Sequence, residues 1–430
     1  MILKISKLLK FPKFFTLILI STMIIMMLTS CSSNKFYVSK LSETEAPTYE
    51  IGIYPKIATI DTDKTDYTDD KVSELARYSI LIVPATILKD AENVISKVKQ
   101  RNSKIKILMY QSSLYDISRN GRNKIGEQKI EESWYFHKAE TSVGQTLEQR
   151  RVLIDKDPLI NMGGELTSLL ISSMKANYKE LKNVDGIYFD NFRTRFNSNT
   201  QFQADTNNDG KDESYMTILS EYTKSLNKIL SEAKTVVGEN GAIIVCTNSW
   251  YDDDSIIQGY TGNVDRNNAN SIVVWGGGNA LGSYDAFINL VDNATKKNAT
   301  HIILEDIAYD LELGETDKIT LDKLSSNDQK VVRVGLCTSM LGESYFMTGI
   351  KNTLLWFPEY DADIGKPKGE YTRLTNYLHV REFENGCIIV NPNPGPVEYV
   401  FTEDYTDITS GVRGKTFSIA GKDGRIFKKN

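Results

Sequence analysis

Eight short apolar segments recur along the chain, and most of the stretches between them carry apolar residues at helical spacing. The eight segments are YPKIATI (54–60), YSILIVP (78–84), KIKILMY (104–110), VDGIYFD (184–190), AIIVCTN (242–248), SIVVWGG (271–277), HIILEDI (301–307) and ESYFMTG (343–349). Nearly continuous apolar runs of this length are typical of strands that are buried on both faces, as in parallel sheets. Eight such strands alternating with helices predict an α/β chain that folds as a (β/α)8 TIM barrel.

The stretches predicted to be helical have the period of an amphipathic helix. They are 70–76, 91–100, 166–181, 215–237, 283–297 and 328–341. The Asn- and Gly-rich segment 255–269 is predicted to hold at most a short helix. No G-x-G-x-x-G turn follows the first strand, which argues against a dinucleotide-binding sheet.

The pattern changes after Trp356. Two strand-like runs flank Glu384-Asn385-Gly386, a sequence that favours a hairpin turn, and helical spacing is absent from there to the C-terminus. We therefore expect the barrel to span 51–364 and a small antiparallel β domain to span 365–430.

Residues 1–30 have the pattern of an export signal. Lysines precede an apolar run from 14 to 28, which is short for a membrane-spanning helix of about twenty residues. Leu28-Thr29-Ser30-Cys31 resembles the bacterial lipobox, in which the signal is cleaved before a cysteine that is then lipidated. This resemblance predicts an extracytoplasmic lipoprotein that is anchored to the membrane through Cys31, with 31–50 as a flexible tether. The alternative is an uncleaved N-terminal anchor.

Cysteine content and charge exclude several classes of protein. The remaining cysteines, Cys246, Cys337 and Cys387, are too widely spaced for a disulfide framework and form no C-x-x-C metal pair. The net charge is −5 with opposite signs interspersed, so the chain has no basic face for nucleic acid. We expect no organic cofactor and a monomeric protein.

The segment VDGIYFDNF (184–192) ends an apolar strand on a carboxylate. In a (β/α)8 barrel the active site lies at the C-terminal ends of the strands. Asp190 and Asn191 are therefore expected to emerge at this end, which makes Asp190 a candidate catalytic residue. Alternatively, Asp190 only caps the segment that follows.

Other polar and aromatic residues are predicted at the same end of the barrel. Tryptophan rings there suit stacking on the apolar faces of sugars, although any one of them can instead be a core residue. The predicted substrate-binding residues are Tyr110, Trp134, Tyr188, Asn191, Asn248, Trp250, Trp275, Asp306, Glu343 and Trp356.

Glycoside hydrolysis needs two carboxyl groups that flank the scissile bond. Asp190 ends the fourth predicted strand and the Glu305-Asp306 pair ends the seventh, across the barrel mouth. Because side chains alternate along a strand, only one of the pair should face inward, and we predict Glu305. Alternatively, the pair only forms salt bridges, for example with Arg193 or Arg195.

A second motif, DTNNDGKDE (205–213), follows the fourth strand. Its oxygen ligands at loop positions one, three and five, with Gly at six and a backbone carbonyl at seven, match an EF-hand calcium loop. Position twelve is Met216 and not Glu, so the bidentate ligand must come from Asp212, Glu213 or elsewhere. The predicted ligands of a structural Ca²⁺ are Asp205, Asn207, Asp209, Lys211, Asp212 and Glu213. The alternative is a solvated acidic loop.

Several segments resemble a known family. They are KIKILMYQSS, SWYFHKAE, RRVLIDKDP, VDGIYFDN, WFPEYDADIGKPKGEY and REFENGCIIVNPNP, within 54–394. They are similar to bacterial TIM-barrel proteins of the hypothetical glycoside hydrolase-like family fifteen and, more remotely, to endo-α-1,4-polygalactosaminidase-like proteins. The resemblance implies a glycosidase in which Asp190 is the catalytic residue.

Two function classes fit the sequence. The first is a glycoside hydrolase that acts on an extracellular or cell-surface polysaccharide or oligosaccharide. The second is a non-catalytic carbohydrate-binding surface lipoprotein on the same fold. A second carboxyl group within reach of Asp190 distinguishes the enzyme from the binding protein.

Overall fold

The computed structural model describes most of the chain beyond Tyr54. The described residues are 54–61, 68–90, 92–112, 124–125, 128–129, 132–140, 144–151, 153–154, 157–158, 164–190, 192, 203–207, 209–246, 260–273, 280–308, 319–349 and 354–430. Residues 47–430 belong to one compact unit. No helix among the described residues has both the length and the hydropathy needed to cross a membrane.

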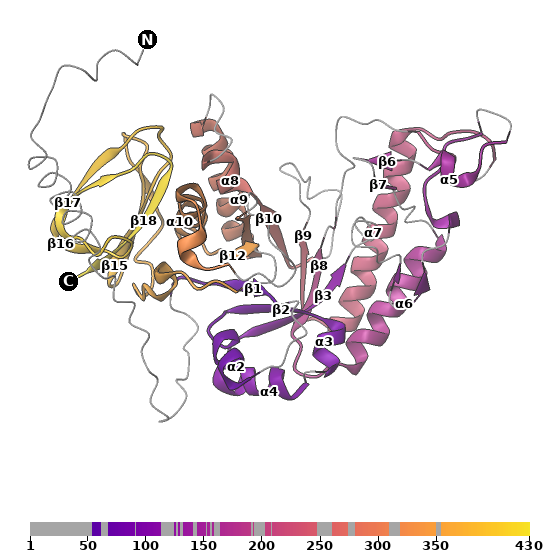
Figure 1. Cartoon of the computed structure of the whole chain (residues 1–430), viewed down its shortest axis with the longest axis horizontal. Coiled ribbons are helices and arrows are strands. Elements are labelled where there is room, and N and C mark those ends of the chain that lie inside the picture. Colours follow the sequence, from indigo (N-terminus) through magenta and orange to yellow (C-terminus); the bar gives the residue numbers. More distant parts are fainter. Residues whose placement is uncertain are drawn as a thin grey trace, which may run out of the picture. The chain divides into compact units, whose positions relative to one another are not determined.

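An eight-stranded parallel sheet forms the centre of this unit (Figure 1). In spatial order its strands are β1 (Ala58–Ile60), β2 (Ile80–Pro84), β3 (Lys106–Ser112), β8 (Gly186–Asp190), β9 (Ala242–Cys246), β10 (Gly262–Arg266), β11 (Thr300–Asp306) and β12 (Tyr345–Gly349). A parallel bridge between Ile57 and Phe346, with the Phe346 N–H donating to the Lys56 carbonyl at 2.9 Å, joins the first strand to the last. The sheet is therefore barrel-like, and the predicted fold class is confirmed.

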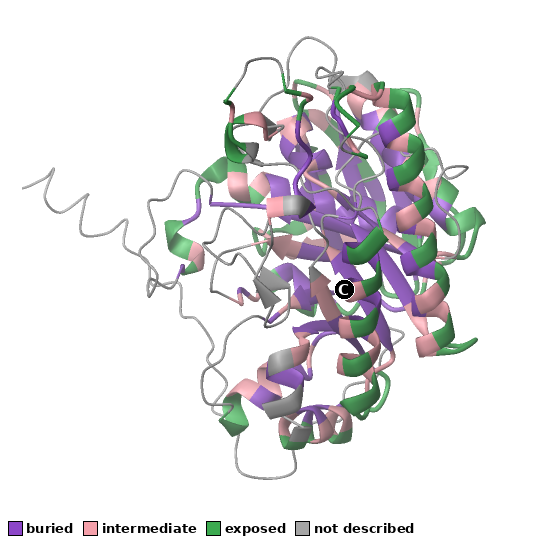
Figure 2. Ribbon diagram, turned by 90° about the vertical axis from the view of Figure 1, so that its right-hand side faces the viewer, coloured by how far each residue is buried: buried purple, intermediate pink, exposed green. Residues whose placement is uncertain are grey.

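Helices follow the strands and cover the outside of the sheet. They are α2 (Asp69–Leu75), α3 (Ala85–Asp90), α4 (Glu92–Arg101), α6 (Gly164–Glu180), α7 (Tyr215–Val237), α8 (Asn268–Val273), α9 (Ala280–Lys296) and α10 (Ser326–Leu341). Short elements lie between β3 and α6: β4 (Lys124–Ile125), β5 (Gln128–Lys129), η1 (Glu132–Trp134), α5 (Leu147–Arg150), β6 (Leu153–Ile154) and β7 (Asp157–Pro158). Figure 2 shows buried strands and helices that alternate between buried and exposed residues, as amphipathic helices do.

Two separate cores follow from the alternation of side chains along the strands. One core lies inside the barrel and includes Ile82, Leu108, Tyr188, Ile244 and Leu304. The other lies between the sheet and the helices and takes the residues of opposite parity, such as Ile187, Phe189 and Ile303. The parity of a residue thus decides whether its side chain faces the barrel interior or the helix layer.

The sixth strand differs from the sequence prediction. The structure places it at Gly262–Arg266, and the predicted strand 271–277 instead begins as the last residues of α8. Of this strand's residues only Val264 belongs to the apolar core, so the segment has no apolar run. Its outward-facing Asp265 pairs with buried His301 at 2.6 Å. Polar contacts hold β10 in the barrel, which is why an apolar pattern did not reveal it.

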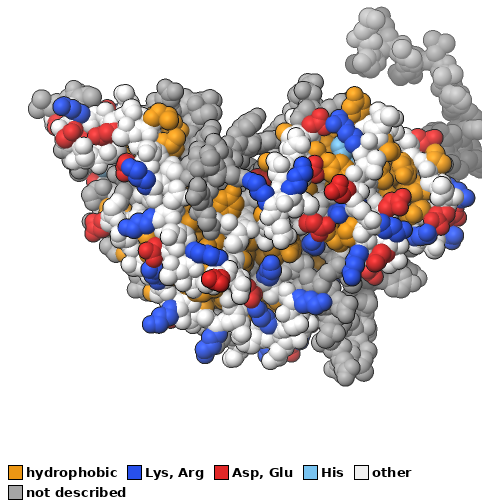
Figure 3. Space-filling model, turned by 180° about the vertical axis from the view of Figure 1, so that it is seen from behind, with side chains coloured by type: hydrophobic (Ala, Val, Ile, Leu, Met, Phe, Trp, Pro, Cys, Tyr) orange, Lys and Arg blue, Asp and Glu red, His pale blue; other side chains and the backbone are white. Residues whose placement is uncertain are grey.

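The C-terminal part forms the predicted antiparallel sheet. In spatial order its strands are β13 (Thr372–Arg373), β14 (His379–Phe383), β15 (Gly386–Asn391), β18 (Asp423–Lys429), β16 (Val397–Asp407) and β17 (Arg413–Ile419). The hairpin expected at Glu384-Asn385 joins β14 to β15. The remaining 3₁₀ turns are η2 (Leu321–Lys323) and η3 (Pro358–Asp361). On the face shown in Figure 3, basic and acidic side chains are interspersed.

Helix α10 joins the barrel to the C-terminal sheet. It is buried without interruption from Val331 to Leu341, because it packs on the barrel strands and on the sheet. Arg333 of α10 donates to both carboxylate oxygens of Asp423, at 2.7 and 3.0 Å, and Asp423 is 1% exposed. Arg425 contacts the same carboxylate at 3.2 Å.

We predict that Asp423→Ala lowers the free energy of unfolding by about 3–5 kcal/mol, because it leaves the buried Arg333 guanidinium without its partner. Urea denaturation measures the change. The exposed pair Asp404 and Arg413, 3.5 Å apart, provides the control, and Asp404→Ala should cost about 1 kcal/mol or less. Equal losses in the two variants would show that the buried pair does not anchor the sheet.

Candidate active site

Asp190 lies at the C-terminal end of β8 and is half-buried. It has the same parity as Tyr188, so its side chain is on the inner side of the barrel. The Tyr110 hydroxyl donates to Asp190 Oδ2 at 2.7 Å, and the Tyr188 hydroxyl donates to Oδ1 at 3.3 Å. Burial raises the pKa of Tyr188 well above its usual value, so this phenol stays protonated as a donor. The two tyrosines therefore hold both oxygens of the carboxylate.

Asp306 ends β11 and also faces the barrel interior, because it shares the parity of Ile302 and Leu304. Arg266 binds it through two nitrogens, with Nη2 3.0 Å from Oδ1. Asn267 Nδ2 donates to Oδ2 at 2.9 Å. Gly349 on β12 leaves room for the carboxylate, since a Cβ there would lie 2.2 Å from Oδ1.

Arg266 connects the two carboxylates electrostatically. Burial lowers the pKa of its guanidinium, but the hydrogen bonds and charge of Asp306 outweigh this effect, and the charge of Asp190 raises the pKa further. The overall pKa lies above the usual value, so Arg266 remains a cation beside Asp306. The three side chains come from the C-terminal ends of β8, β10 and β11.

Glu305 has the orientation opposite to the one predicted. Its side chain lies on the same face of β11 as that of Ile303, so it faces the helix layer, and it is 0% exposed. The backbone N–H groups of Ala269 and Asn270 donate to it at 2.8 and 3.1 Å. Burial raises the pKa of Glu305 to about 8, although these N–H groups lower it. The prediction that Glu305 is the inward-facing acid is wrong, and Asp306 takes that position.

Two predicted substrate-binding residues lie away from the mouth. Glu343 precedes β12, at the N-terminal end of the strands, and accepts hydrogen bonds from Lys56 Nζ at 2.8 Å and Arg381 Nη2 at 3.0 Å. Trp356 packs in the helix layer, with its ring 5.3 Å from that of Tyr78 and the Arg77 guanidinium 3.5 Å above it. Both placements correct the predicted positions.

The remaining predicted binding residues divide into two groups. Tyr110 and Tyr188 contact Asp190, whereas Trp134 is 5% exposed on η1 and has no free face for a sugar. Four residues lie outside the described part of the chain: Asn191, Asn248, Trp250 and Trp275.

A cluster of charged side chains, which the sequence analysis did not assign to a site, lies in the segment after β3. Glu132 accepts hydrogen bonds from Arg151 Nε at 2.8 Å and from His137 Nε2 at 2.9 Å. The bonds from Arg151 and then from His137 lower the pKa of Glu132 to about 2, against the effect of partial burial. His137 and Arg151 lie in the segments SWYFHKAE and RRVLIDKDP, and Glu132 directly precedes the first of them, so only the family resemblance pointed to this region.

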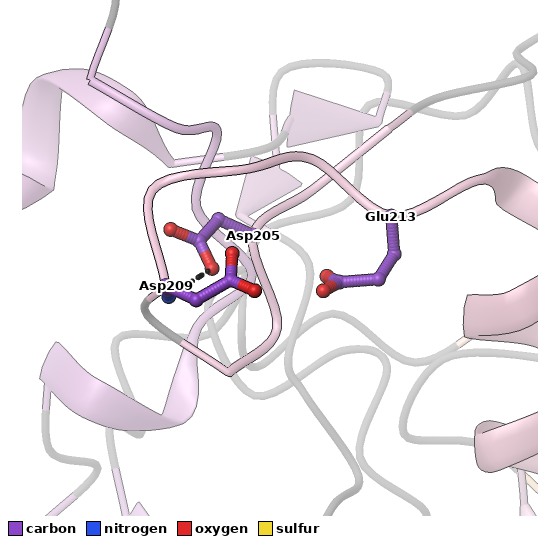
Figure 4. Close-up of side chains that lie close together, drawn as sticks. All are labelled: Asp205, Asp209 and Glu213. Atoms are coloured by element: carbon purple, nitrogen blue, oxygen red, sulfur yellow. Dashed lines mark hydrogen bonds between the residues drawn. The ribbon is translucent and has the colours of Figure 1, made fainter.

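The acidic loop after β8 is tied to this cluster, because the Asp205 N–H donates to the His137 carbonyl at 2.8 Å. Carboxylate oxygens of Asp205, Asp209 and Glu213 lie within 4.8 Å of one another, and Figure 4 shows the three side chains converging. Gly210 takes a φ of 85°, the left-handed conformation that the sharp turn requires.

Other predicted ligands of this loop have separate contacts. Asn207 Oδ1 accepts the Asp209 N–H at 2.9 Å, and the Lys211 N–H donates to Asp209 Oδ1 at 2.9 Å. Asp212 turns away from the three acids and accepts the Ala139 N–H at 2.5 Å. Asp205, Asp209 and Glu213 thus form an oxygen-only cluster of the kind that hard cations prefer.

A known family matches most of this chain. A family model described as hypothetical glycosyl hydrolase family 15 matches residues 99–387. No curated protein matches the chain.

Similar solved structures include an α-amylase from H. orenii, 11% identical over 87% of this chain and 99% of that chain, with a TM-score of 0.43. Endo-glycoceramidase II from Rhodococcus sp. is 10% identical over 87% of this chain and 97% of that chain, with a TM-score of 0.43. A cyclic α-maltosyl-(1→6)-maltose hydrolase from Arthrobacter globiformis is 11% identical over 84% of this chain and 88% of that chain, with a TM-score of 0.44.

Proposed function

The chain belongs to the hypothetical glycosyl hydrolase family 15, and on this premise we propose that it hydrolyses glycosidic bonds of an extracellular or cell-surface polysaccharide. One observation carries the proposal. Asp190 and Asp306 are the last residues of β8 and β11, and both have the parity that faces the barrel interior. Two carboxyl groups at the mouth of one barrel are what glycoside hydrolysis requires.

The contacts of each acid favour particular roles. Each oxygen of Asp190 accepts a hydrogen bond from a phenol hydroxyl, which stabilises the ionised carboxylate. An ionised carboxylate suits a nucleophile or a general base rather than a proton donor. We propose Asp306 as the second carboxyl group, with Arg266 and Asn267 fixing its orientation. Tyr110 positions Asp190 from the neighbouring strand β3.

One observation favours a second function. Both oxygens of Asp306 are already occupied by Arg266 and Asn267, as expected of an acid that holds a barrel together and does no chemistry. A carbohydrate-binding protein without turnover would have such an arrangement. Both functions require the protein to bind a carbohydrate, but only the glycosidase would also cleave it.

We expect Asp190→Asn to reduce turnover by at least about a hundredfold, because an amide keeps the shape but cannot attack or exchange a proton. Ligand binding should persist. Screening the parent on a polysaccharide panel with product analysis identifies the substrate, after which turnover, binding and melting temperature are measured on one preparation.

Asp185→Asn is the matched control. Asp185 directly precedes β8, at the end opposite Asp190. It accepts hydrogen bonds from Lys99 Nζ at 2.8 Å and from the Ile107 N–H at 2.7 Å. Its replacement should therefore lower stability and leave turnover unchanged. Near-normal turnover of Asp190→Asn would end the catalytic assignment. Oligosaccharide binding by a parent that releases no product from any substrate of the panel would establish the non-catalytic alternative.

We also propose that the loop 205–213 binds a structural Ca²⁺ through Asp205, Asp209 and Glu213, with Asn207 and the Lys211 carbonyl as further ligands. The convergence of three carboxylates supports this proposal. Since the loop is hydrogen-bonded to His137, the ion would stabilise the segment that follows β3.

Calcium at about a hundred times its dissociation constant should raise the free energy of unfolding by about 2.7 kcal/mol, because it binds only the folded loop. EGTA should reverse the rise. Asp209→Asn should abolish the calcium effect, while Asp212→Asn, in the same loop but turned toward Ala139, should retain it. Melting curves that calcium and EGTA leave unmoved would contradict the proposal.

Cys31 lies outside the described residues, and the Leu28-Thr29-Ser30-Cys31 motif alone supports our proposal that it is lipidated. Cys31→Ala should move the protein from the membrane fraction to the soluble fraction. Fractionation with a radiolabelled fatty acid measures both properties. Membrane retention of the variant, with no lipid label on the parent, would point to an uncleaved anchor.

A further inference from the structure

The end of β11 carries a second buried carboxylate directly beside Asp306. Glu305 is 0% exposed and accepts the N–H groups of Ala269 and Asn270 at 2.8 and 3.1 Å. These two residues form the first turn of α8. On its other side, Glu305 packs against α10, where a Cβ at Gly335 would lie 3.1 Å from its Cγ. Glu305 thus attaches the start of α8 to the last turn of the strand.

The same turn of α8 holds Asp306. Asn270 Nδ2 lies 3.2 Å from Glu305 Oε2 and 2.6 Å from the Asp306 carbonyl oxygen. Asn267 binds Asp306 twice: its Oδ1 accepts the Asp306 N–H at 2.9 Å, and its Nδ2 donates to Oδ2 at 2.9 Å. Two asparagines therefore link Glu305 to the acid that faces the barrel interior.

Backbone strain occurs on both sides of this contact. Asn267 and Ala308 have positive φ angles of 62° and 63°, and for Ala308 this conformation is unfavourable. The Ala308 N–H donates to Asp328 Oδ1 of α10 at 3.0 Å, which holds the strained turn in place. A strained turn persists only where its surroundings fix it, so the position of Asp306 is over-determined.

We propose that Glu305 is a positioning residue: by binding the first turn of α8, it fixes Asn267 and Asn270 so that Asp306 and Arg266 keep their places at the barrel mouth. The proposal rests on the proposed glycosidase function of the same site. Among the described residues no cation pairs with Glu305, and burial raises the pKa of this carboxyl group to about 8. The site tolerates this disadvantage next to Asp306, where orientation matters most for a reacting acid.

Glu305→Gln tests the proposal in the full-length protein. Above a pH of about 8 Glu305 is ionised and both of its oxygens accept N–H groups, so the variants are compared there. An amide must turn its NH₂ group toward one of these donors, so at least one contact to α8 is lost. Glu359→Gln is the matched control: Glu359 is 6% exposed, accepts the Thr409 hydroxyl at 2.9 Å and belongs to η3, away from the strand ends. Hydrogen exchange of the amides in 267–270 is measured for both variants, together with kcat and KM on the substrate that the panel identifies.

Glu305→Gln should speed exchange of these amides by about tenfold or more and lower kcat by about tenfold, with KM changed by less than about threefold. Glu359→Gln should change neither. Unchanged exchange in 267–270 would overturn the proposal, and so would faster exchange with unchanged kcat, because Glu305 would then be only structural.

If Glu305→Gln fails to fold, Asn270→Ala removes the link to Asp306 and leaves the backbone contacts of Glu305. It should lower kcat by about tenfold, and an unchanged kcat would overturn the proposal. A parent without turnover on any polysaccharide would instead refute the proposed function. Oligosaccharide affinity then replaces kcat: weaker binding by Glu305→Gln than by Glu359→Gln supports the positioning role, and equal binding overturns it.

Discussion

The strict alternation of side chains along parallel strands is the constraint on which the rest of this structure depends. Each barrel strand sends one parity to the interior and the other to the helix layer, and both environments are closed to water over most of their length. Asp190 and Asp306 lie at the interior of the barrel mouth because each ends its strand on the inner parity. Glu305, one residue before Asp306, faces the helix layer instead and is buried there.

The sequence was sufficient to predict the barrel wherever apolar runs mark its strands, and to predict Asp190 as a strand end. It missed β10, whose outward side is polar: Asp265 pairs with His301, and His301 in turn lies 2.7 Å from the Ser344 hydroxyl. Such a strand is held by hydrogen bonds between residues far apart in the chain. Neither apolar period nor strand propensity can reveal partners that only the closed sheet brings together.

The errors at the site have different physical origins. Glu343 precedes β12, and the direction of a parallel strand alone places it at the end opposite Asp190, so the sequence contained that answer. The choice between Glu305 and Asp306 depended on the parity of β11, which Ile302 and Ile303 cannot reveal because both are apolar and buried. Trp356 packs on Tyr78, a contact between residues far apart in the chain that the sequence alone did not reveal.

Buried polar groups are concentrated in the sector of β10 to β12. Asp265, His301, Glu305 and Ser344 all face the helix layer there, and Arg266 and Asp306 face the interior of the same strands. An apolar contact between a helix and a sheet is non-directional, whereas hydrogen bonds fix distance and angle. The sector that carries the Arg266–Asp306 pair is thus packed on its outer side partly through directional contacts. Buried hydrogen bonds on the outer face of these strands fix their positions, and with them the orientation of Asp306 on the inner face. This gives the outer contacts a role beyond stability.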